Sequence, residues 1–337
     1  MKTILKNIIL TILAITFFSC NQDDDAPKNN KTTDVYVAGF EDNGLRTVAK
    51  IWKNGIGTPL TDGSRTSEAH SIFVSNGDIY VAGFVYEGPK STAKLWKNGM
   101  ETSLTDGSKN AEAKSVYVSG TDVYVAGYES GDAKLWKNGI ELPLTDGTNF
   151  SEALSVYVSG NDIYVAGFEE KDFIDVAKIW KNGIEIPLTD GLNYAQATSV
   201  YVSGNDVYAV GYERNGTKNV AKMWKNGIGK SLTSGVNKAE ATSVYVSDGD
   251  VYVVGYEDSE TKTVAKMWKN GMETSLTNGV NEAQVYAVHV AGEDVYVAGY
   301  EDGDSTIYVK IWENGKEIAL TDGSNYGIAK DVFTVTY

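Results

Sequence analysis

Few residues in this chain have the types and spacing that catalysis or metal binding requires. Its 337 residues include one cysteine and two histidines, which excludes a disulfide framework or a thiolate zinc site and leaves little material for a His-based metal centre. His70 and His289 have no partner at a recognisable spacing, so we interpret both as structural. Catalysis needs unlike groups held at one place. The sequence predicts no catalytic residue, although its many acidic residues leave a hydrolase or lyase as an alternative function.

Three aromatic residues are the first candidates for ligand binding. Phe150, Tyr194 and Tyr326 each follow an asparagine at an equivalent place in a repeated segment. An aromatic ring there is either a platform for a ligand or a side chain packed against the adjacent loop, and both interpretations stay open here. Other copies of that place carry Thr66, Lys238 and Glu282.

Arginine is rare and lies in segments that vary between repeats. The chain has three, Arg46, Arg65 and Arg214. A cluster of guanidinium groups can bind a carboxylate, so Arg46 and Arg65 are also candidate ligand-binding residues. Arg214 lies four repeats away from Arg46, and the alternative interpretation is scattered, solvated charge.

Several Asp-Gly pairs could supply oxygen ligands to calcium. More often such an aspartate closes a turn on its own backbone. We therefore expect no cofactor, with calcium as the alternative. The aspartates are Asp62, Asp106, Asp146, Asp190 and Asp322.

These candidates belong to a unit that recurs seven times. The seven tryptophans, from Trp52 to Trp312, lie 44 residues apart except for one interval of 40. Each is followed by Lys-Asn-Gly, or by Glu-Asn-Gly in the last copy, and an Asp-Val/Ile-Tyr marker recurs at matching spacing. Units of this length are typical of four-stranded propeller blades. We interpret the tryptophans as packing residues between blades, with sugar stacking as the alternative.

Each unit predicts four strands, here named A to D. In the fourth unit they are the runs around residues 156–158, 163–168, 176–180 and 184–188, joined by turn sequences such as Asn182-Gly183. Proline in strand D of three units (Pro59, Pro143 and Pro187) predicts that D is the outer edge of each blade. The connections from A to B and from C to D barely vary. The connections from B to C, for example residues 170–175, and from D to A do vary, so specific recognition is expected on their face of the ring.

The first unit lacks a strand A, and the chain ends on an A-like run, Val332 to Tyr337, with no strand B after it. We expect this run to pair with residues 35–39 and close the ring. Residues 34–337 resemble seven-bladed β-propeller lipoproteins of Gram-negative bacteria with a Trp-Lys-Asn-Gly hairpin. The resemblance implies an all-β fold with four antiparallel strands in each blade. The chain lacks the Trp-Asp, Gly-Gly and Ser-x-Asp-x-Gly-x-x-Trp signatures of the WD, kelch and sialidase propellers, and no characterised function accompanies the resemblance.

The first 33 residues predict export and anchoring. Residues 1–19 have two lysines and then a short apolar run, which is the layout of a signal peptide. Cys20 follows Ser19, as in a lipoprotein signal, so we expect Cys20 to be lipidated. Residues 20–33 then form an acidic, polar tether, and Asp23 to Asp25 are either a surface-export tag or a plain linker.

The charge and the repeats together limit the function. A formal charge of −15 argues against a nucleic-acid partner, because such affinity comes from basic residues that neutralise phosphates. We expect a monomeric binding module at the outer membrane, exposed at the cell surface, with a glycan or protein ligand on the B–C and D–A face. The alternative is a structural subunit of an outer-membrane assembly.

Overall fold

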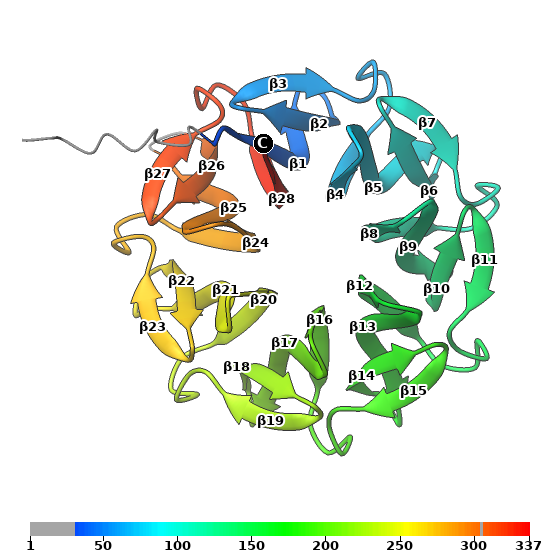
Figure 1. Cartoon of the computed structure of the whole chain (residues 1–337), viewed down its shortest axis with the longest axis vertical. Coiled ribbons are helices and arrows are strands. Elements are labelled where there is room, and N and C mark those ends of the chain that lie inside the picture. The colour runs from blue at the N-terminus through cyan, green and yellow to red at the C-terminus, as the bar shows by residue number, and fades with distance from the viewer. Residues whose placement is uncertain (1–30, 304–305) are drawn as a thin grey trace, which may run out of the picture. The chain divides into compact units, whose positions relative to one another are not determined.

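The computed structural model describes residues 31–303 and 306–337. Within these residues the regular structure is all β: 28 strands form seven antiparallel sheets of four strands, arranged as a ring (Figure 1). The predicted seven-bladed β-propeller is therefore confirmed. The described residues contain no helix with the length and apolarity to span a bilayer.

Each sheet is one blade, with its strands in the order A to D from the axis outward. The A strands of blades 1 to 7 are β28 (Gly327–Thr336), β4 (Ser67–Ser75), β8 (Ala111–Ser119), β12 (Ser151–Ser159), β16 (Ala195–Ser203), β20 (Ala239–Ser247) and β24 (Ala283–Ala291). The B strands are β1 (Thr33–Asp42), β5 (Asp78–Glu87), β9 (Asp122–Glu129), β13 (Asp162–Lys171), β17 (Asp206–Asn215), β21 (Asp250–Asp258) and β25 (Asp294–Asp302). The C strands are β2 (Thr47–Lys53), β6 (Lys90–Lys97), β10 (Asp132–Lys137), β14 (Ile174–Lys181), β18 (Lys218–Lys225), β22 (Thr263–Lys269) and β26 (Ile307–Glu313). The D strands are β3 (Ile56–Pro59), β7 (Met100–Ser103), β11 (Ile140–Pro143), β15 (Ile184–Pro187), β19 (Ile228–Ser231), β23 (Met272–Ser275) and β27 (Lys316–Ala319).

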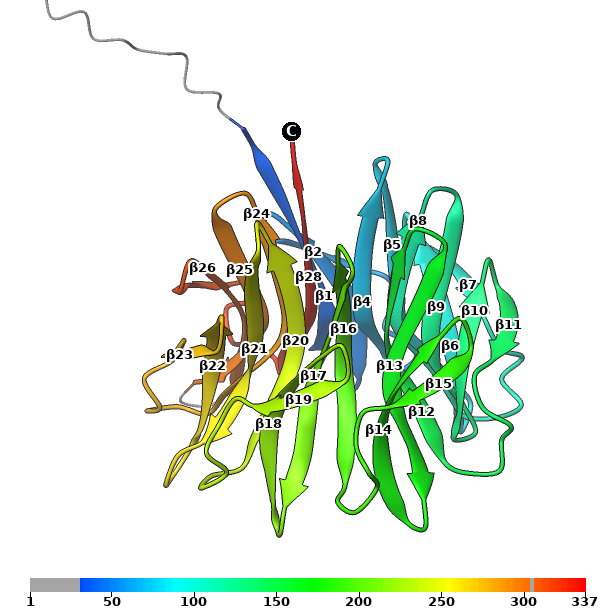
Figure 2. The ribbon, with the colours of Figure 1, turned by 60° about the horizontal axis from the view of Figure 1, so that its bottom comes forward.

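The last strand closes the ring as predicted. β28 pairs with β1 in antiparallel register from Thr33↔Thr336 to Glu41↔Gly327, so blade 1 is built from both ends of the described chain. Figure 2 shows the start of β1 and the end of β28 side by side at one face of the ring. This face carries the A–B and C–D turns, and we call it the constant face. The opposite face, with the B–C and D–A connections, is called the loop face.

The two sequence markers, Asp-Val/Ile-Tyr and Lys-Asn-Gly, bind each other at the constant face. In blade 1 the Asp34 carboxylate lies 2.8 Å from the Lys53 ammonium and accepts a 2.7 Å hydrogen bond from the Asn54 side chain. The Lys53 ammonium also lies 5.0 Å from the centroid of the Tyr36 ring. Asn54 has a positive φ of 50°, as the tight turn before strand D requires. The strict repetition of both markers therefore has a structural cause.

The tryptophans are the main packing residues between blades. All seven are 2% exposed or less. Trp224 of blade 5, for example, packs with Tyr164, Ile179 and Leu188 of blade 4. Burial of this residue type at each junction joins neighbouring sheets. The interpretation of these residues as core, rather than as a sugar-stacking series, is confirmed.

One β-bulge recurs in the A strands. In blade 4 the pairing between β12 and β13 shifts register between Ala153 and Ser155, which leaves Leu154 without a cross-strand partner. The strand opposite carries Gly167, where a Cβ atom would lie 2.0 Å from the carbonyl oxygen of Glu152. Only glycine fits at that distance. The side chain at the bulge can reach the A strand of the next blade, as Oγ1 of Thr198 does when it donates to the Ala241 carbonyl at 2.8 Å.

An unbroken circle of aromatic side chains surrounds the axis on the constant-face side of the bulges. We call it the aromatic ring set. Neighbouring ring centroids lie 4.6–4.8 Å apart, one from each blade. His289 is one member, so the structural interpretation of this histidine agrees with its place in the fold. The members are Phe73, Tyr117, Tyr157, Tyr201, Tyr245, His289 and Phe333.

Acidification should destabilise the protein through His289. Burial lowers the pKa of His289 from 6.5 to about 4, so the folded imidazole stays neutral where the unfolded one has gained a proton. Stability should therefore fall as pH drops from about 6.5 towards 4. His289→Phe should remove this contribution, since Phe73 and Phe333 already stand at equivalent positions.

Urea unfolding of both proteins at pH 7 and pH 5 measures the difference. Asp331, whose pKa burial raises to about 6, is present in both proteins and cancels in the comparison. Identical pH dependence in the two proteins would show that His289 does not carry the effect.

The expected B–C loops are shorter than the sequence suggests. The segment 170–175 was expected to be a loop, but β13 runs to Lys171 and β14 begins at Ile174. Asp172 and Phe173 alone make the turn, both with positive φ. The strands extend because their backbone groups continue to pair across the hairpin. Likewise the D–A connection expected over 189–198 ends at Tyr194, because β16 begins at Ala195.

Candidate functional site

The loop face brings Arg46 and Arg65 together. Arg46 lies between β1 and β2 of blade 1, and Arg65 lies in the connection from β3 to β4 of blade 2. Both line a surface pocket of about 370 Å³ at the junction of the two blades. The remaining lining residues are Ser64, Thr66, Tyr86 and Gly88. We call this pocket the blade 1–2 pocket.

Hydrogen bonds hold both arginines in place. The Nη1 of Arg46 donates to the carbonyl oxygen of Ser64 at 2.5 Å. The Nη1 of Arg65 donates to Oε1 of Glu87 at 3.0 Å. Each guanidinium group has five donor hydrogens, so both keep donors for a ligand. The Tyr86 side chain, 39% exposed, supplies an aromatic surface beside them.

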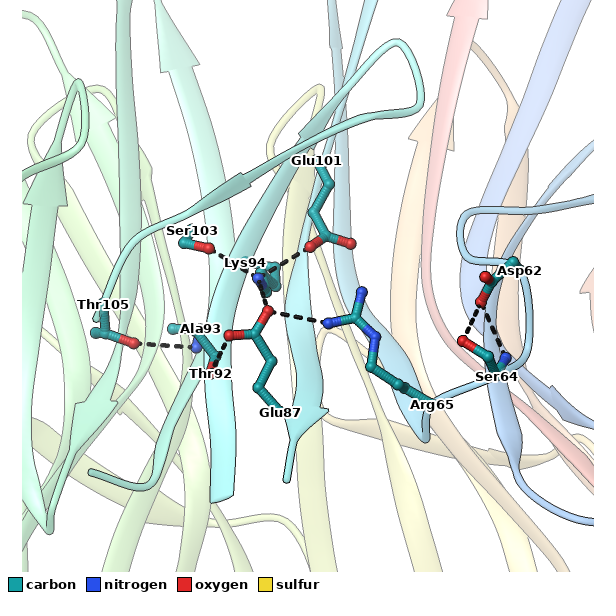
Figure 3. A network of polar contacts seen from close by, with 10 residues as sticks. All are labelled: Asp62, Ser64, Arg65, Glu87, Thr92, Ala93, Lys94, Glu101, Ser103 and Thr105. Atoms are coloured by element: carbon teal, nitrogen blue, oxygen red, sulfur yellow. Dashed lines mark hydrogen bonds and ion pairs between the residues drawn. The ribbon is translucent and has the colours of Figure 1, made fainter. Parts of the chain in front are cut away.

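A buried lysine positions the carboxylate that holds Arg65. Figure 3 shows one oxygen of Glu87 between Arg65 and Lys94, and Lys94 also pairs with Glu101. Lys94 is 1% exposed. Its hydrogen bond to Glu87 is the largest of the effects that lower the pKa of that carboxyl. Glu87 therefore stays ionised at neutral pH and anchors Arg65.

Blade 2 has this network because its sequence departs from the repeat. In blade 4, Lys178 of strand C forms an ion pair with Glu169. Val176 lies opposite Glu169 on the neighbouring strand. In blade 2 these two positions are Val85 and Thr92, which again face each other. Glu87, two residues further along, takes the place of the missing carboxylate. Sequence reasoning missed Tyr86 and Glu87, although the paired change to Val85 and Thr92 is a signal that could have found them.

The blade 1–2 pocket differs in charge from two other pockets on the loop face. The pocket between blades 3 and 4 is lined by Asp146, Glu169, Glu170 and Glu185 as well as two lysines. A pocket beside Arg214 in blade 5 includes Glu213. No acidic residue is among those that line the blade 1–2 pocket. It is therefore the pocket of the three that best suits an anionic group.

The three aromatic candidates lie on the loop face in different blades. Phe150 precedes β12 of blade 4, Tyr194 precedes β16 of blade 5, and Tyr326 precedes β28 of blade 1. They are 47%, 38% and 42% exposed. Blades 4 and 5 are neighbours, whereas blade 1 lies across the ring from both (Figure 1).

Each of these aromatic side chains packs against a residue of its own blade. The Phe150 ring centroid lies 5.9 Å from that of Phe168, and the Tyr326 centroid lies 5.8 Å from that of Phe40. The guanidinium carbon of Arg214 lies 5.1 Å from the Tyr194 ring centroid. The structure thus brings Arg214 to Tyr194, and it does not gather the three aromatics into one surface.

The Asp-Gly aspartates close their own turns. Oδ1 of Asp62 accepts hydrogen bonds from the backbone and side chain of Ser64, which lower the pKa of Asp62. Asp146 and Thr148 repeat the arrangement. In residues 31–303 and 306–337, no three His, Cys, Asp or Glu side chains lie close enough together to hold a metal ion. Cys20 and the predicted signal and export-tag segments lie outside the described residues.

Comparisons with known proteins give no family. No protein-family model and no curated protein matches the chain. The similar solved structures include the computationally designed protein Ika8 (21% identity, TM-score 0.46, 85% of this chain and 86% of that one). They also include TolB from Acinetobacter baumannii (12%, 0.49, 73% and 64%) and a chain of a nidogen/laminin complex (8%, 0.47, 90% and 98%). None of these similarities is close enough to indicate a ligand.

Proposed function

We propose that this protein is a lipid-anchored binding module of the cell surface that holds an anionic glycan on its loop face. The observation that supports the ligand class is the blade 1–2 pocket, where Arg46 and Arg65 meet without a lining carboxylate. A guanidinium group donates two parallel hydrogen bonds to a carboxylate or sulfate. The exposed ring of Tyr86 suits the apolar face of the sugar that carries such a group.

The negative charge of the protein does not prevent this binding. The formal charge is −15 over the whole chain, but at physiological salt charges are screened over about 8 Å. An anionic group in the blade 1–2 pocket would therefore respond mainly to the nearby charges, which are the two guanidinium groups and the Glu87 carboxylate that binds Arg65. Its affinity should decrease as salt rises, because both guanidinium groups are exposed to solvent.

The place where the chain enters the ring supports the proposed orientation. β1 begins at Thr33, which pairs with Thr336 at the constant face. A lipid on Cys20 would join the ring there through 13 intervening steps of chain, which reach at most about 45 Å when extended. The constant face would then lie towards the membrane. The loop face, with the blade 1–2 pocket, would face away from it.

Cells that display the full chain provide the test. Wild-type cells should bind fluorescent polygalacturonate, a polymer of sugar carboxylates, and should bind its methyl ester much less. Arg46→Ala with Arg65→Ala should reduce binding of the acid by about tenfold or more, because charge-assisted hydrogen bonds to the ligand are lost. Cys20→Ala should abolish cell-associated binding while the released protein keeps its affinity.

Two matched controls make the result specific. Arg214→Ala removes an exposed arginine from another blade and should leave binding unchanged. Glu87→Gln weakens the anchor of Arg65 and should give an intermediate loss, while Lys94 keeps its pair with Glu101. Equal binding by the wild type and the double arginine variant would overturn the assignment of this pocket.

A further inference from the structure

Every blade but the last exposes one large apolar side chain at the same place on the constant face. This place is the first residue of strand D, directly after the Asn-Gly turn from strand C, and it lies at the perimeter of the ring (Figure 1). Blade 7 has Lys316 there. The six apolar side chains are 70–77% exposed. We call them the apolar rim: Ile56, Met100, Ile140, Ile184, Ile228 and Met272.

The rim stays apolar although its neighbours in strand D vary. The next residue is Gly57 in blade 1 and Glu101 in blade 2, and the residue after it ranges from Thr58 to Lys230. The turn itself does not require an apolar side chain, because Lys316 follows the same turn in blade 7. Single exposed apolar residues are common on protein surfaces, whereas six at one equivalent place mark an interaction surface.

The loop face has no such circle in the described part of the chain. The place after the glycine of each D–A connection is apolar in three consecutive blades, and the other four blades have serine or threonine there. Two B–C turns add one exposed apolar residue each. These loop-face residues are Leu192, Val236 and Val280 in the D–A connections, and Leu45 and Phe173 in the B–C turns. Apolar contact around nearly the whole perimeter is therefore a property of the constant face.

The charges beside the rim cancel in six blades. The lysine before each Asn-Gly turn lies 2.7–2.8 Å from the aspartate of the Asp-Val/Ile-Tyr marker, as Lys181 does from Asp162. In blade 7 the two positions are Glu313 and Asp294, which are both acidic. These positions thus offer no excess of positive charge to an anionic partner. The partner must be recognised through apolar contact.

The shape of the rim selects a flat partner. Equivalent positions of a closed ring lie at one level along its axis, so the six side chains lie around one circle. A peptide segment or a single helix would reach only neighbouring blades, whereas a membrane surface contacts all of them. Apolar side chains that enter the boundary between headgroups and acyl chains are stabilised there by their burial.

We propose that the constant face docks on the lipid bilayer through the apolar rim. This inference rests on the proposed lipid anchor. β1 enters the ring at the constant face, where Thr33 pairs with Thr336, so an anchor on Cys20 brings this face next to the membrane. The anchor tethers the ring, and the rim fixes its orientation with the loop face directed outward. The rim needs the anchor, because the tether supplies the high local concentration at which weak apolar contacts form.

Fluorescence of the full-length, lipidated protein in phosphatidylcholine vesicles tests the proposal. In Ile184→Cys, an environment-sensitive dye on the introduced thiol should be quenched by nitroxide-labelled lipid and protected from aqueous iodide. In Phe173→Cys, the dye marks the loop face of the same blade at a residue that is 82% exposed, and it should show the opposite behaviour. The unsubstituted protein should take up no dye, since lipidation occupies its one thiol. Addition of anionic phosphatidylglycerol should not strengthen quenching by the lipid, because the positive charges beside the rim are already paired.

A pair of matched variants identifies the rim as the cause. Replacement of the other five rim residues by serine in labelled Ile184→Cys should remove quenching by the lipid and restore quenching by iodide. Replacement of the five exposed apolar residues of the loop face by serine is the control and should change neither. Both variants should fold, because all the replaced side chains are exposed.

The outcomes separate this inference from the anchor. Absence of the chain from floated vesicles would overturn the anchor and this inference together. A chain that floats with the vesicles while iodide quenches its label at residue 184 would overturn this inference alone. A label protected from both quenchers would also overturn it, because a protein surface such as a second copy of the ring would then cover the rim.

Discussion

Removal of residues 332–337 should destabilise the whole ring. The deletion takes away five of the nine residue pairs between β28 and β1, from Val37↔Val332 to Thr33↔Thr336. It also removes Val332 from the core between blades 7 and 1, and Phe333 from the aromatic ring set. Each blade is stabilised by its two neighbours, so one open junction weakens the entire closed array. The exposed edge of β1 should in addition promote aggregation.

Thermal unfolding followed by circular dichroism measures this effect. The truncated chain should melt far below the wild type or fail to accumulate in soluble form. A deletion of Tyr337 alone is the control, because this residue lies beyond β28 and is exposed. It should melt with the wild type. A 332–337 deletion that also melts with the wild type would show that the ring does not need this strand for closure.

Trp180→Ala should cost about 3 to 5 kcal/mol of unfolding free energy, the range for removal of a large buried side chain. Trp180 is fully buried and packs with Tyr124, Leu135 and Leu144 of blade 3. Its Nε1 has no hydrogen-bond partner, so the loss is one of apolar packing. Trp180→Phe should therefore keep a substantial part of the stability.

Urea denaturation of the three proteins gives the comparison. Ile184→Ala is a suitable control, because this residue lies four positions away in β15 and is 71% exposed. It should have little effect. Binding of polygalacturonate by folded Trp180→Ala should be unchanged, since Trp180 is remote from the blade 1–2 pocket in the ring. Unchanged unfolding together with lost binding would instead make the tryptophans a ligand surface.

Much of the fold was predictable because its determinants are local and repeated. The spacing of tryptophans from Trp52 to Trp312 determined the number of blades, and turn residues such as Asn182-Gly183 located the hairpins. Proline at Pro59, Pro143 and Pro187 identified the outer strand, since proline cannot donate to a neighbouring strand. The closure of the ring could also be predicted, because the first unit lacks a strand A and the chain ends on an additional strand A. The B–C connections were predicted less well, because nothing in 170–175 indicated that pairing continues almost to the turn.

The candidate sites were predictable only in part. Arg46 and Arg65 were recognised as rare residues in variable segments, but their convergence depends on how a B–C turn of one blade meets a D–A connection of the next. The distance between the two arginines is set by the packing of blade 1 against blade 2, which involves residues that are not neighbours in the sequence. Phe150, Tyr194 and Tyr326 occupy equivalent positions of different repeats, so each lies in its own blade, and blade 1 with Tyr326 lies across the ring from blades 4 and 5 (Figure 1).

The bulged position of strand A shows the limit most clearly. Lys330 and Tyr286 lie in different repeats, and each occupies an ordinary place in a β-strand, yet the Lys330 ammonium lies 4.2 Å from the centroid of the Tyr286 ring. Each is the unpaired residue at the bulge of its strand, and the glycine opposite the bulge, such as Gly167 in blade 4, makes room for the bulged backbone. Ring closure then brings seven different blades to one centre. The sequence by itself determined the repeating blade, through short-range turn and strand chemistry. Only the tertiary structure decided which unlike residues meet, because closure of the ring makes neighbours of residues that the chain keeps apart.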